Sequence, residues 1–158
     1  MKFSDLPLHP SILEAVEAMR YDECTPIQER AIPPLLEGRD LIGIAQTGTG
    51  KTAAYLLPII QQLTTRQYPQ NAINCIIMAP TRELARQIDQ AVEALSYFVP
   101  VSSVAVYGGN DAQRYEQELR GLKLGADIVI ATPGRLLSHL ARRDSPACRT
   151  NAPQSRAH

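Results

Sequence analysis

The chain has 158 residues, and its 16 basic and 16 acidic side chains give a formal net charge of zero. This length is typical of about one domain, and the balanced charge excludes a surface that binds nucleic acid through a bulk positive field. Any contact with nucleic acid must therefore come from locally placed side chains, and arginine, which forms bidentate contacts with phosphate, is the commoner cation here.

Two helices are predicted in the N-terminal part of the chain. A Ser-x-x-Glu capping pattern at 11–14 and apolar residues at helical spacing predict a helix over 11–20. Thr25 followed by Pro26 predicts the start of a second helix, with proline at the first helical position. The pair Pro33-Pro34 predicts its end, because proline lacks the backbone N–H that continues a helix.

A glycine-rich loop follows at 45–52, between a predicted strand and a predicted helix. The apolar run 40–44 predicts a buried strand, and apolar residues at helical spacing from Ala53 to Leu63 predict the helix. A small residue, four free positions and Gly-Lys-Thr form the pattern of a phosphate-binding loop, or P-loop. Its residues are Ala45, Gln46, Thr47, Gly48, Thr49, Gly50, Lys51 and Thr52.

Each residue type of the P-loop suits contact with phosphate. Gly48 and Gly50 can adopt positive φ and bring backbone N–H groups close to an anion, which also faces the positive end of the following helix. Lys51 can reach the β- and γ-phosphates, and the Thr52 hydroxyl can bind Mg²⁺. The alternative, a turn that merely joins a strand to a helix, leaves Lys51 and Thr52 unexplained. The loop therefore predicts a nucleoside triphosphate site with Mg²⁺.

Three more strands alternate with helices in the rest of the chain. The strands are predicted at 74–79, 101–107 and 127–131, and the helices at 81–95, 112–122 and 132–141. This alternation predicts an α/β fold with a parallel sheet and helices on both faces, in which ligands bind outside the carboxyl ends of the strands. Residues 142–158 lack apolar periodicity and predict a disordered tail.

The cysteines and the apolar segments indicate a cellular setting. Cys24, Cys75 and Cys148 show no metal-ligand spacing, and a reduced, cytoplasmic environment fits them best. The N-terminus has no apolar leader, and no apolar run approaches the roughly 18 residues of a membrane helix. We therefore expect neither a signal peptide nor a membrane span, and we interpret Cys75 as a small core residue.

From Pro80 to Ala85 the sequence reads Pro-Thr-Arg-Glu-Leu-Ala, and here the chain resembles the DEAD-box RNA helicases. Further matches fall in the order that the family has. They are the upstream aromatic Phe3, the Q motif with Tyr21 and 25–28, the P-loop at 45–52, the pair Gly108-Gly109, and Thr-Pro-Gly-Arg at 132–135. The resemblance covers residues 1–141 and implies an incomplete RecA-like ATP-binding domain, with its Q-motif region at 1–30.

The resemblance implies an adenine site beside the P-loop, made by Phe3, Tyr21, Thr25 and Gln28. By the family's pattern, the Gln28 amide pairs with the edge of the base and Tyr21 stacks on it. Lys51 and Thr52 then act on the phosphates as catalytic groups, with ATP and Mg²⁺ as cofactors. The Thr25-x-x-Gln28 pattern is also a capping box, in which Gln28 bonds back to the Thr25 backbone, and both interpretations remain open.

RNA binding is implied at three segments that follow strands. Their residues are Pro80, Thr81, Arg82, Gly108, Gly109, Thr132, Pro133, Gly134 and Arg135. They offer arginines, close backbone approach and helix N-termini that would hold RNA phosphates without reading bases. Each segment also has a purely structural interpretation: Thr81 as a helix N-cap, the glycine pair as a turn, and Thr-Pro-Gly as a helix entry.

The family continues with an Asp-Glu-Ala-Asp strand, a Ser-Ala-Thr strand and a second RecA-like domain, none of which this sequence contains. In the family's sheet the first two lie between the P-loop strand and the strand before Pro80. Their absence implies exposed sheet edges, with repacking, self-association or marginal stability as open outcomes. We interpret the chain as a truncation whose residues 142–158 are foreign to the family.

We expect the intact parent to be an ATP-dependent RNA helicase, which couples the unwinding of RNA to ATP hydrolysis. This chain alone is expected to bind adenine nucleotide with negligible hydrolysis, because the acidic motif and the arginine finger are missing. Two alternatives remain: a non-catalytic regulator that binds nucleotide or RNA, and a different P-loop phosphotransferase such as a small kinase.

Overall fold

The computed structural model describes residues 1–109 and 112–141 of the chain. These residues divide into two compact units. The first unit contains Met1–Gln67 and Gln90–Val101, and the second contains Tyr68–Asp89 and the chain from Ser102 onward. The predicted tail at 142–158 lies outside the described residues.

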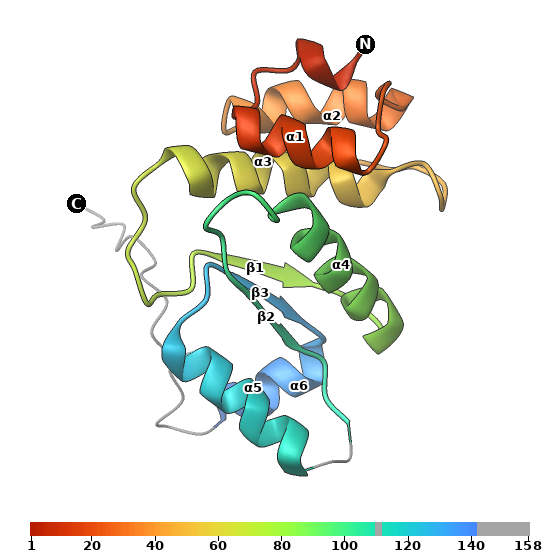
Figure 1. Cartoon of the computed structure of the whole chain (residues 1–158). Coiled ribbons are helices and arrows are strands. Elements are labelled where there is room, and N and C mark those ends of the chain that lie inside the picture. Colours follow the sequence, from red (N-terminus) through yellow and green to blue (C-terminus); the bar gives the residue numbers. More distant parts are fainter. Residues whose placement is uncertain (110–111, 142–158) are drawn as a thin grey trace, which may run out of the picture. The chain divides into compact units, whose positions relative to one another are not determined.

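The second unit is built on a three-stranded parallel sheet with the order β1-β3-β2 (Figure 1). The strands are β1 (Cys75–Met78), β2 (Ser103–Val106) and β3 (Ile128–Ala131). All four residues of β3 are buried, as expected for a central strand of a parallel sheet that is covered on both faces. The predicted α/β fold with a parallel sheet is therefore confirmed, and it is consistent with an incomplete RecA-like domain.

Two helices of the second unit, α5 (Ala112–Leu124) and α6 (Pro133–Leu140), contribute to one core cluster with the sheet. Alternate side chains of a strand point to opposite faces. The cluster on one face combines Val129 and Ala131 of β3 with Val106 of β2, Leu122 of α5 and the partly buried Leu136 of α6. Ile128 and Ile130 of β3 point the other way and are also fully buried.

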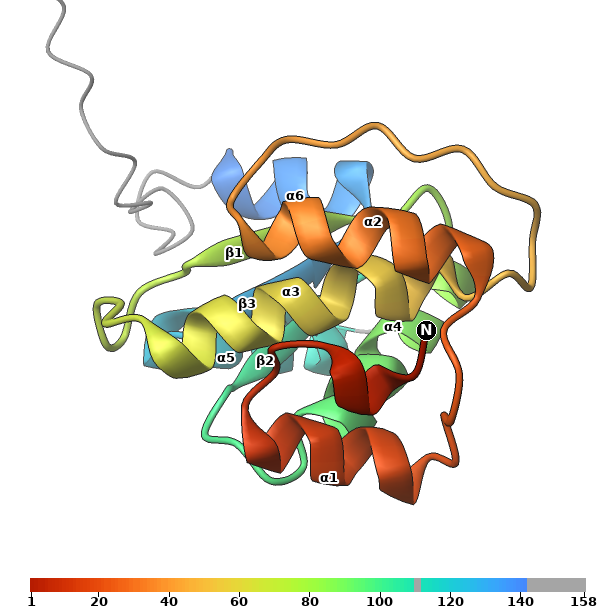
Figure 2. The same cartoon turned by 90° about the horizontal axis from the view of Figure 1, so that it is seen from above.

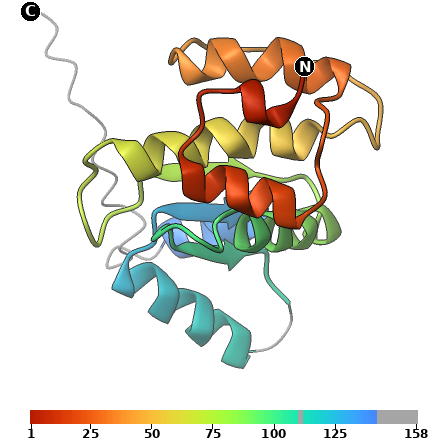
Figure 3. The same cartoon turned by 45° about the horizontal axis from the view of Figure 1, so that its top comes forward.

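The first unit is helical and is organised around α3 (Lys51–Thr65), with η1 (Phe3–Asp5), α1 (Pro10–Ala18) and α2 (Pro26–Leu36) beside it (Figure 3). Most of the apolar residues that predicted α3 are buried, namely Ala53, Ala54, Leu56, Leu57 and Ile60. Two hydrogen bonds attach the neighbouring segments to α3: Gln62 Nε2 donates to the Leu35 carbonyl over 3.1 Å, and the His9 N–H donates to Gln61 Oε1 over 2.7 Å. The remaining helix, α4 (Arg82–Leu95), ends in this unit from Gln90 onward.

The predicted start of α1 is wrong in its capping residue. The Ser11 N–H donates to His9 Nδ1 over 3.2 Å, and the helix begins at Pro10. Proline suits the first helical position because its missing N–H would have no partner there. An imidazole nitrogen thus takes the place that the Ser-x-x-Glu pattern gave to a hydroxyl.

The predicted end of α2 is also wrong, because the helix continues through Pro33 and Pro34 to Leu36. The prolines remove two hydrogen bonds, but the N–H of Glu37 still donates to the Pro33 carbonyl over 3.2 Å. Buried Ile32 and the packing of α2 along α3 stabilise the helix where its own hydrogen bonds are lost.

The predicted strand at 40–44 does not form. Ile42 is 95% exposed and Ile44 is 92% exposed, and Figure 2 shows this segment within a long loop that joins α2 to α3. A strand needs the hydrogen bonds of a neighbouring strand, and no strand of the described residues pairs with this segment. The predicted buried strand is therefore wrong, because the described part of the chain offers no neighbouring strand to pair with this segment.

Two further observations concern the Cys75 thiol and the apolar content of the helices. Cys75 in β1 is half-buried, so the structure places it at the margin of the core and not within it. Partial burial raises the pKa of its thiol to about 11, so this thiol stays protonated at neutral pH. None of the described helices combines the length and the apolar composition that spanning a bilayer requires.

The close approach of α5 to β2 gives a test of the second unit's packing. A Cβ on Gly121 of α5 would lie 2.5 Å from Val104 Cγ2. We expect Gly121→Ala to lower the free energy of unfolding by about 1–3 kcal/mol through overpacking, although alanine is the better helix former. Chemical denaturation measures this, and adding Val104→Ala should recover part of the loss. A Gly121→Ala variant that is more stable than the parent would contradict the packing described.

Candidate nucleotide and nucleic-acid sites

The P-loop leads directly into α3, as the sequence predicts. Gly50 precedes the helix with a φ of 80°, and Gly48 has a φ of 81°, a region that residues with a Cβ rarely adopt. The Lys51 ammonium donates to the Ala45 carbonyl at the other end of the loop. The lysine is thus folded over the loop whose backbone N–H groups would meet a phosphate.

The start of α2 is hydrogen-bonded to the end of the P-loop. Gln28 Nε2 donates to the Gly50 carbonyl over 3.1 Å, and the Thr25 hydroxyl donates to the Thr49 carbonyl over 2.7 Å. Gln28 is only 4% exposed, and a Cβ on Gly50 would lie 2.4 Å from its Nε2 atom. Glycine at position 50 therefore leaves the room that this contact needs.

Gln28 also makes the capping bond that the sequence offered as an alternative. Its Oε1 atom accepts from the Thr25 N–H over 2.9 Å. A primary amide has two N–H groups and two lone pairs on its oxygen, so one of each remains after these contacts. The capping role and a contact with a base are therefore compatible for the same side chain.

A cavity of about 300 Å³ lies at this junction in the first unit. The cavity is lined by seven of the residues that the sequence predicts to bind a nucleotide, namely Phe3, Tyr21, Thr25, Gln28, Gly48, Gly50 and Thr52. The Phe3 and Tyr21 rings stack with their centroids 6.0 Å apart; Phe3 is buried, whereas Tyr21 is 38% exposed. The exposed tyrosine is the ring available to a ligand, and the buried phenylalanine supports it from behind.

The Thr52 hydroxyl is the single protein ligand that the sequence offers for Mg²⁺. Across residues 1–109 and 112–141, no three His, Cys, Asp or Glu side chains gather as metal ligands. In the P-loop pattern a Ser or Thr hydroxyl contacts Mg²⁺, and phosphate oxygens, water and one or two carboxylates usually complete its shell. Thr52, on the wall of the cavity next to the P-loop, fits that pattern.

The second unit gathers most of the residues assigned to RNA at one edge of its sheet. Segments that follow β1, β2 and β3 line a cavity of about 530 Å³. Six of the assigned residues are among them, namely Pro80, Thr81, Arg82, Gly109, Thr132 and Arg135. The remaining three lie nearby in the chain: Gly108 lines a neighbouring cavity, and Pro133 and Gly134 form the exposed first turn of α6.

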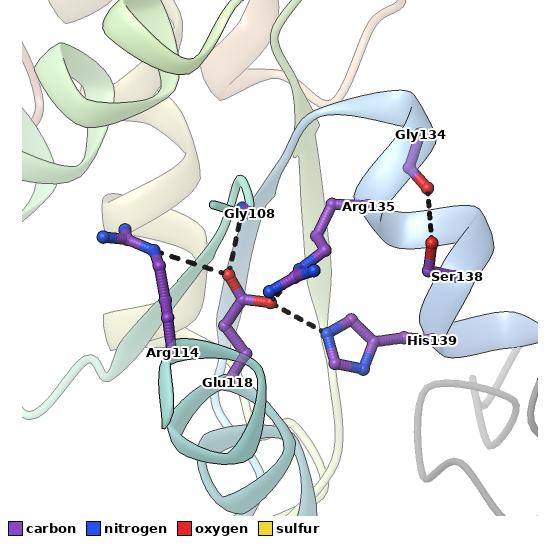
Figure 4. A network of polar contacts seen from close by, with 7 residues as sticks. All are labelled: Gly108, Arg114, Glu118, Gly134, Arg135, Ser138 and His139. Atoms are coloured by element: carbon purple, nitrogen blue, oxygen red, sulfur yellow. Dashed lines mark hydrogen bonds and ion pairs between the residues drawn. The ribbon is translucent and has the colours of Figure 1, made fainter. Parts of the chain in front are cut away.

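A buried carboxylate, Glu118 of α5, lies at the centre of a polar network beneath this edge (Figure 4). The side chain is 3% exposed. Its Oε1 atom accepts from the Gly108 N–H over 3.1 Å. Its Oε2 atom accepts from Arg135 Nε over 2.7 Å and lies 2.9 Å from His139 Nε2. One side chain thus connects the turn after β2 with the first turns of α6.

Arg135 is held in place by the network. Its Nε atom is bonded to Glu118, and its guanidinium carbon lies 4.7 Å from the centre of the Tyr115 ring. The ring of Tyr115 in turn stacks on the ring of His139, with their centres 4.3 Å apart. The contacts with Glu118 and Tyr115 fix the orientation of the Arg135 guanidinium, and its Nη2 atom is buried without a hydrogen-bond partner among the described atoms.

Sequence reasoning missed Glu118, Tyr115 and His139 as parts of this site. The signal in the sequence was weak but present. Glu118 lies four residues before Leu122, and both are buried, so the glutamate occupies the inward face of its helix. A charged residue on the apolar face of a predicted helix indicates a buried partner of opposite charge.

The comparison with protein families identifies the family of the chain. Residues 25–152 match the family model described as "DEAD/DEAH box helicase", which is more than half of the chain. The chain belongs to the DEAD/DEAH box helicase family. The P-loop, the segment at 80–85 and the Thr-Pro-Gly-Arg segment at 132–135 all lie within the matched residues.

Curated relatives from bacteria and yeast carry the name of RNA helicases. The chain is 49% identical over 142 residues to the ATP-dependent RNA helicase CshA of Listeria monocytogenes, covering 90% of this chain and 26% of the relative. It is 48% identical over 141 residues to DeaD of Escherichia coli, covering 89% and 22%. It is 47% identical over 138 residues to the ATP-dependent rRNA helicase RRP3 of Meyerozyma guilliermondii, covering 87% and 28%. The chain thus spans about a quarter of the length of these DEAD-box relatives.

The Glu118 network gives a second test. Removing one partner of a buried ion pair leaves an uncompensated charge, which typically costs about 3–5 kcal/mol. We expect Glu118→Ala to lower the free energy of unfolding by about 3 kcal/mol, measured by chemical denaturation. Glu116→Ala, which removes an exposed carboxylate from the same helix, is the matched control and should change stability by less than about 0.5 kcal/mol. Equal effects of the two substitutions would show that the Glu118 network does not stabilise the fold.

Proposed function

We propose that residues 1–141 form the ATP-binding and RNA-binding part of an ATP-dependent RNA helicase. The observation that carries the proposal is the cavity of about 300 Å³ in the first unit. Residues of the adenine-binding pattern and of the P-loop, which are far apart in the sequence, line it together and are hydrogen-bonded to one another. A purely structural turn does not explain why an exposed tyrosine, a buried amide and a phosphate-binding loop line the same cavity.

In the proposed complex the first unit binds ATP along this cavity. Tyr21 stacks on the adenine, and the unused N–H and lone pair of Gln28 pair with its edge. Backbone N–H groups of the P-loop and the N-terminus of α3 hold the phosphates. Lys51 exchanges its contact with the Ala45 carbonyl for the phosphates, and bound Mg²⁺, held partly by Thr52, neutralises their charge.

In the second unit, the edge of the sheet binds the RNA backbone. Arg82 and Arg135 supply charge, and the N-terminus of α6 and the glycine pair supply backbone N–H groups. None of these groups is arranged to read a base, so the proposed binding is independent of sequence. The cytoplasmic setting, the domain boundary at 141 and self-association through exposed edges remain predictions.

Binding of ATP is tested by removing the lysine. We expect Lys51→Ala to weaken ATP binding about 10–100-fold, because a charge-assisted hydrogen bond is worth about 1.5–3 kcal/mol. Isothermal titration calorimetry with Mg²⁺ measures this effect. Lys123→Ala, an exposed lysine of α5, is the control and should leave ATP binding unchanged. Equal affinity of the parent and Lys51→Ala would contradict the proposed site.

Hydrolysis is expected to stay at background level in this chain. The 158 residues of this chain contain no Asp-Glu-Ala-Asp motif to hold Mg²⁺ and orient the attacking water, and an arginine finger is worth about 10³–10⁵ in rate where one is present. Phosphate release, measured with saturating ATP and RNA, should not differ between the parent and Lys51→Ala. A parent rate that clearly exceeds the rate of that variant would show that other residues of this chain supply the missing groups.

A further inference from the structure

A second cavity continues the proposed RNA surface toward α5. It has a volume of about 480 Å³ and shares four lining residues with the cavity at the sheet edge, namely Arg82, Glu83, Tyr107 and Gly109. The two cavities are therefore neighbouring parts of one groove. The second adds Arg86 of α4 together with Gln113, Arg114 and Gln117 of α5, which we call the α5 extension. None of these four residues belongs to the segments that resemble helicase motifs.

The charges along the second cavity favour an anionic ligand. Arg82, Arg86 and Arg114 line it, and Glu83 is the acidic residue on its wall. Arg82 and Arg86 are four residues apart on one helix, so they lie on the same face of it. Arg86 is exposed, so its guanidinium can move onto a ligand.

Arg114 is oriented before any ligand arrives. Its guanidinium carbon lies 4.0 Å from the centre of the Tyr107 ring, and its Nε atom lies 3.8 Å from Glu118 Oε1. Figure 4 shows the two terminal nitrogens of Arg114 turned away from Glu118. The contact with the Tyr107 ring orients the planar guanidinium, and its terminal nitrogens form the fork of donors that suits a phosphate.

We propose that the α5 extension is a further phosphate-binding subsite, which holds the RNA strand beyond the sheet edge through Arg86 and Arg114. The inference rests on the proposed binding of RNA by the second unit, and it adds at least one nucleotide to the strand that this unit covers. The phosphate recognised here belongs to the same strand that contacts Arg82, because Arg82 lines both parts of the groove.

The test compares RNA strands of two lengths on the whole chain. Fluorescence anisotropy gives the affinity of oligouridylates of about four and about ten nucleotides, lengths that bracket a small single-strand site. The double variant Arg86→Gln with Arg114→Gln should weaken binding of the long strand about tenfold and leave the short strand within about twofold. The slope of log affinity against log salt for the long strand should fall by about 0.7, the value for one phosphate contact on a single strand.

Two further variants make the result specific. Arg120→Gln removes an exposed arginine of α5 that does not line the groove, and it should change neither affinity. Arg86→Gln alone removes a side chain that is exposed, so the fold should be retained. It should weaken binding of the long strand about threefold, in the same direction as the double variant.

Each other outcome overturns the subsite, and the outcomes distinguish it from the proposed function. If the double variant binds the long strand as the parent does, the subsite is wrong while RNA binding at the sheet edge stands. If it weakens both lengths equally, the arginines act on the whole surface and no separate subsite exists. If the parent binds neither strand, the proposed RNA binding fails, and the subsite fails with it.

Discussion

β3 hydrogen-bonds to β1 and β2 at once, and the second unit depends on this double pairing. The register places Met78 and Val106 opposite Ala131, so all three strands end at the same level. Parallel strands direct their carboxyl ends to one edge of the sheet, which is where ligands bind in open α/β folds. Segments that follow residues 78, 106 and 131 therefore meet, and the N–H of Thr132 donates to the Val106 carbonyl over 3.1 Å.

The Glu118 carboxylate fixes the chemistry of that edge. Burial of a charge is unfavourable unless it is paired and hydrogen-bonded, and Glu118 satisfies this with Arg135, His139 and the Gly108 N–H. The same contacts hold the Arg135 fork and the glycine turn in one geometry. An arginine that is held in this way would lose less conformational freedom on binding a phosphate, so Glu118 connects the stability of the fold with the proposed binding of RNA.

In the first unit, a few polar contacts connect the helix that starts at Pro26 with the P-loop. Gln28 and Thr25 donate to the carbonyls of Gly50 and Thr49, where α3 begins. Packing of α2 along α3 stabilises this junction, and the helix tolerates two prolines because burial, and not its own hydrogen bonds, stabilises it. The P-loop and the residues proposed to contact the base are therefore connected by hydrogen bonds within this unit.

The sequence by itself determined the elements whose signals are local. Positive φ at Gly48 and Gly50, the helix after the P-loop and the three strands of the sheet follow from residue type and periodicity over a few positions. Only the tertiary structure decided that the strand predicted at 40–44 stays unpaired, that Glu118 lies beneath the sheet edge, and that Arg114 extends the groove. The reason is that strand pairing and buried ion pairs depend on partners far away in the chain, and a local sequence pattern does not identify these partners.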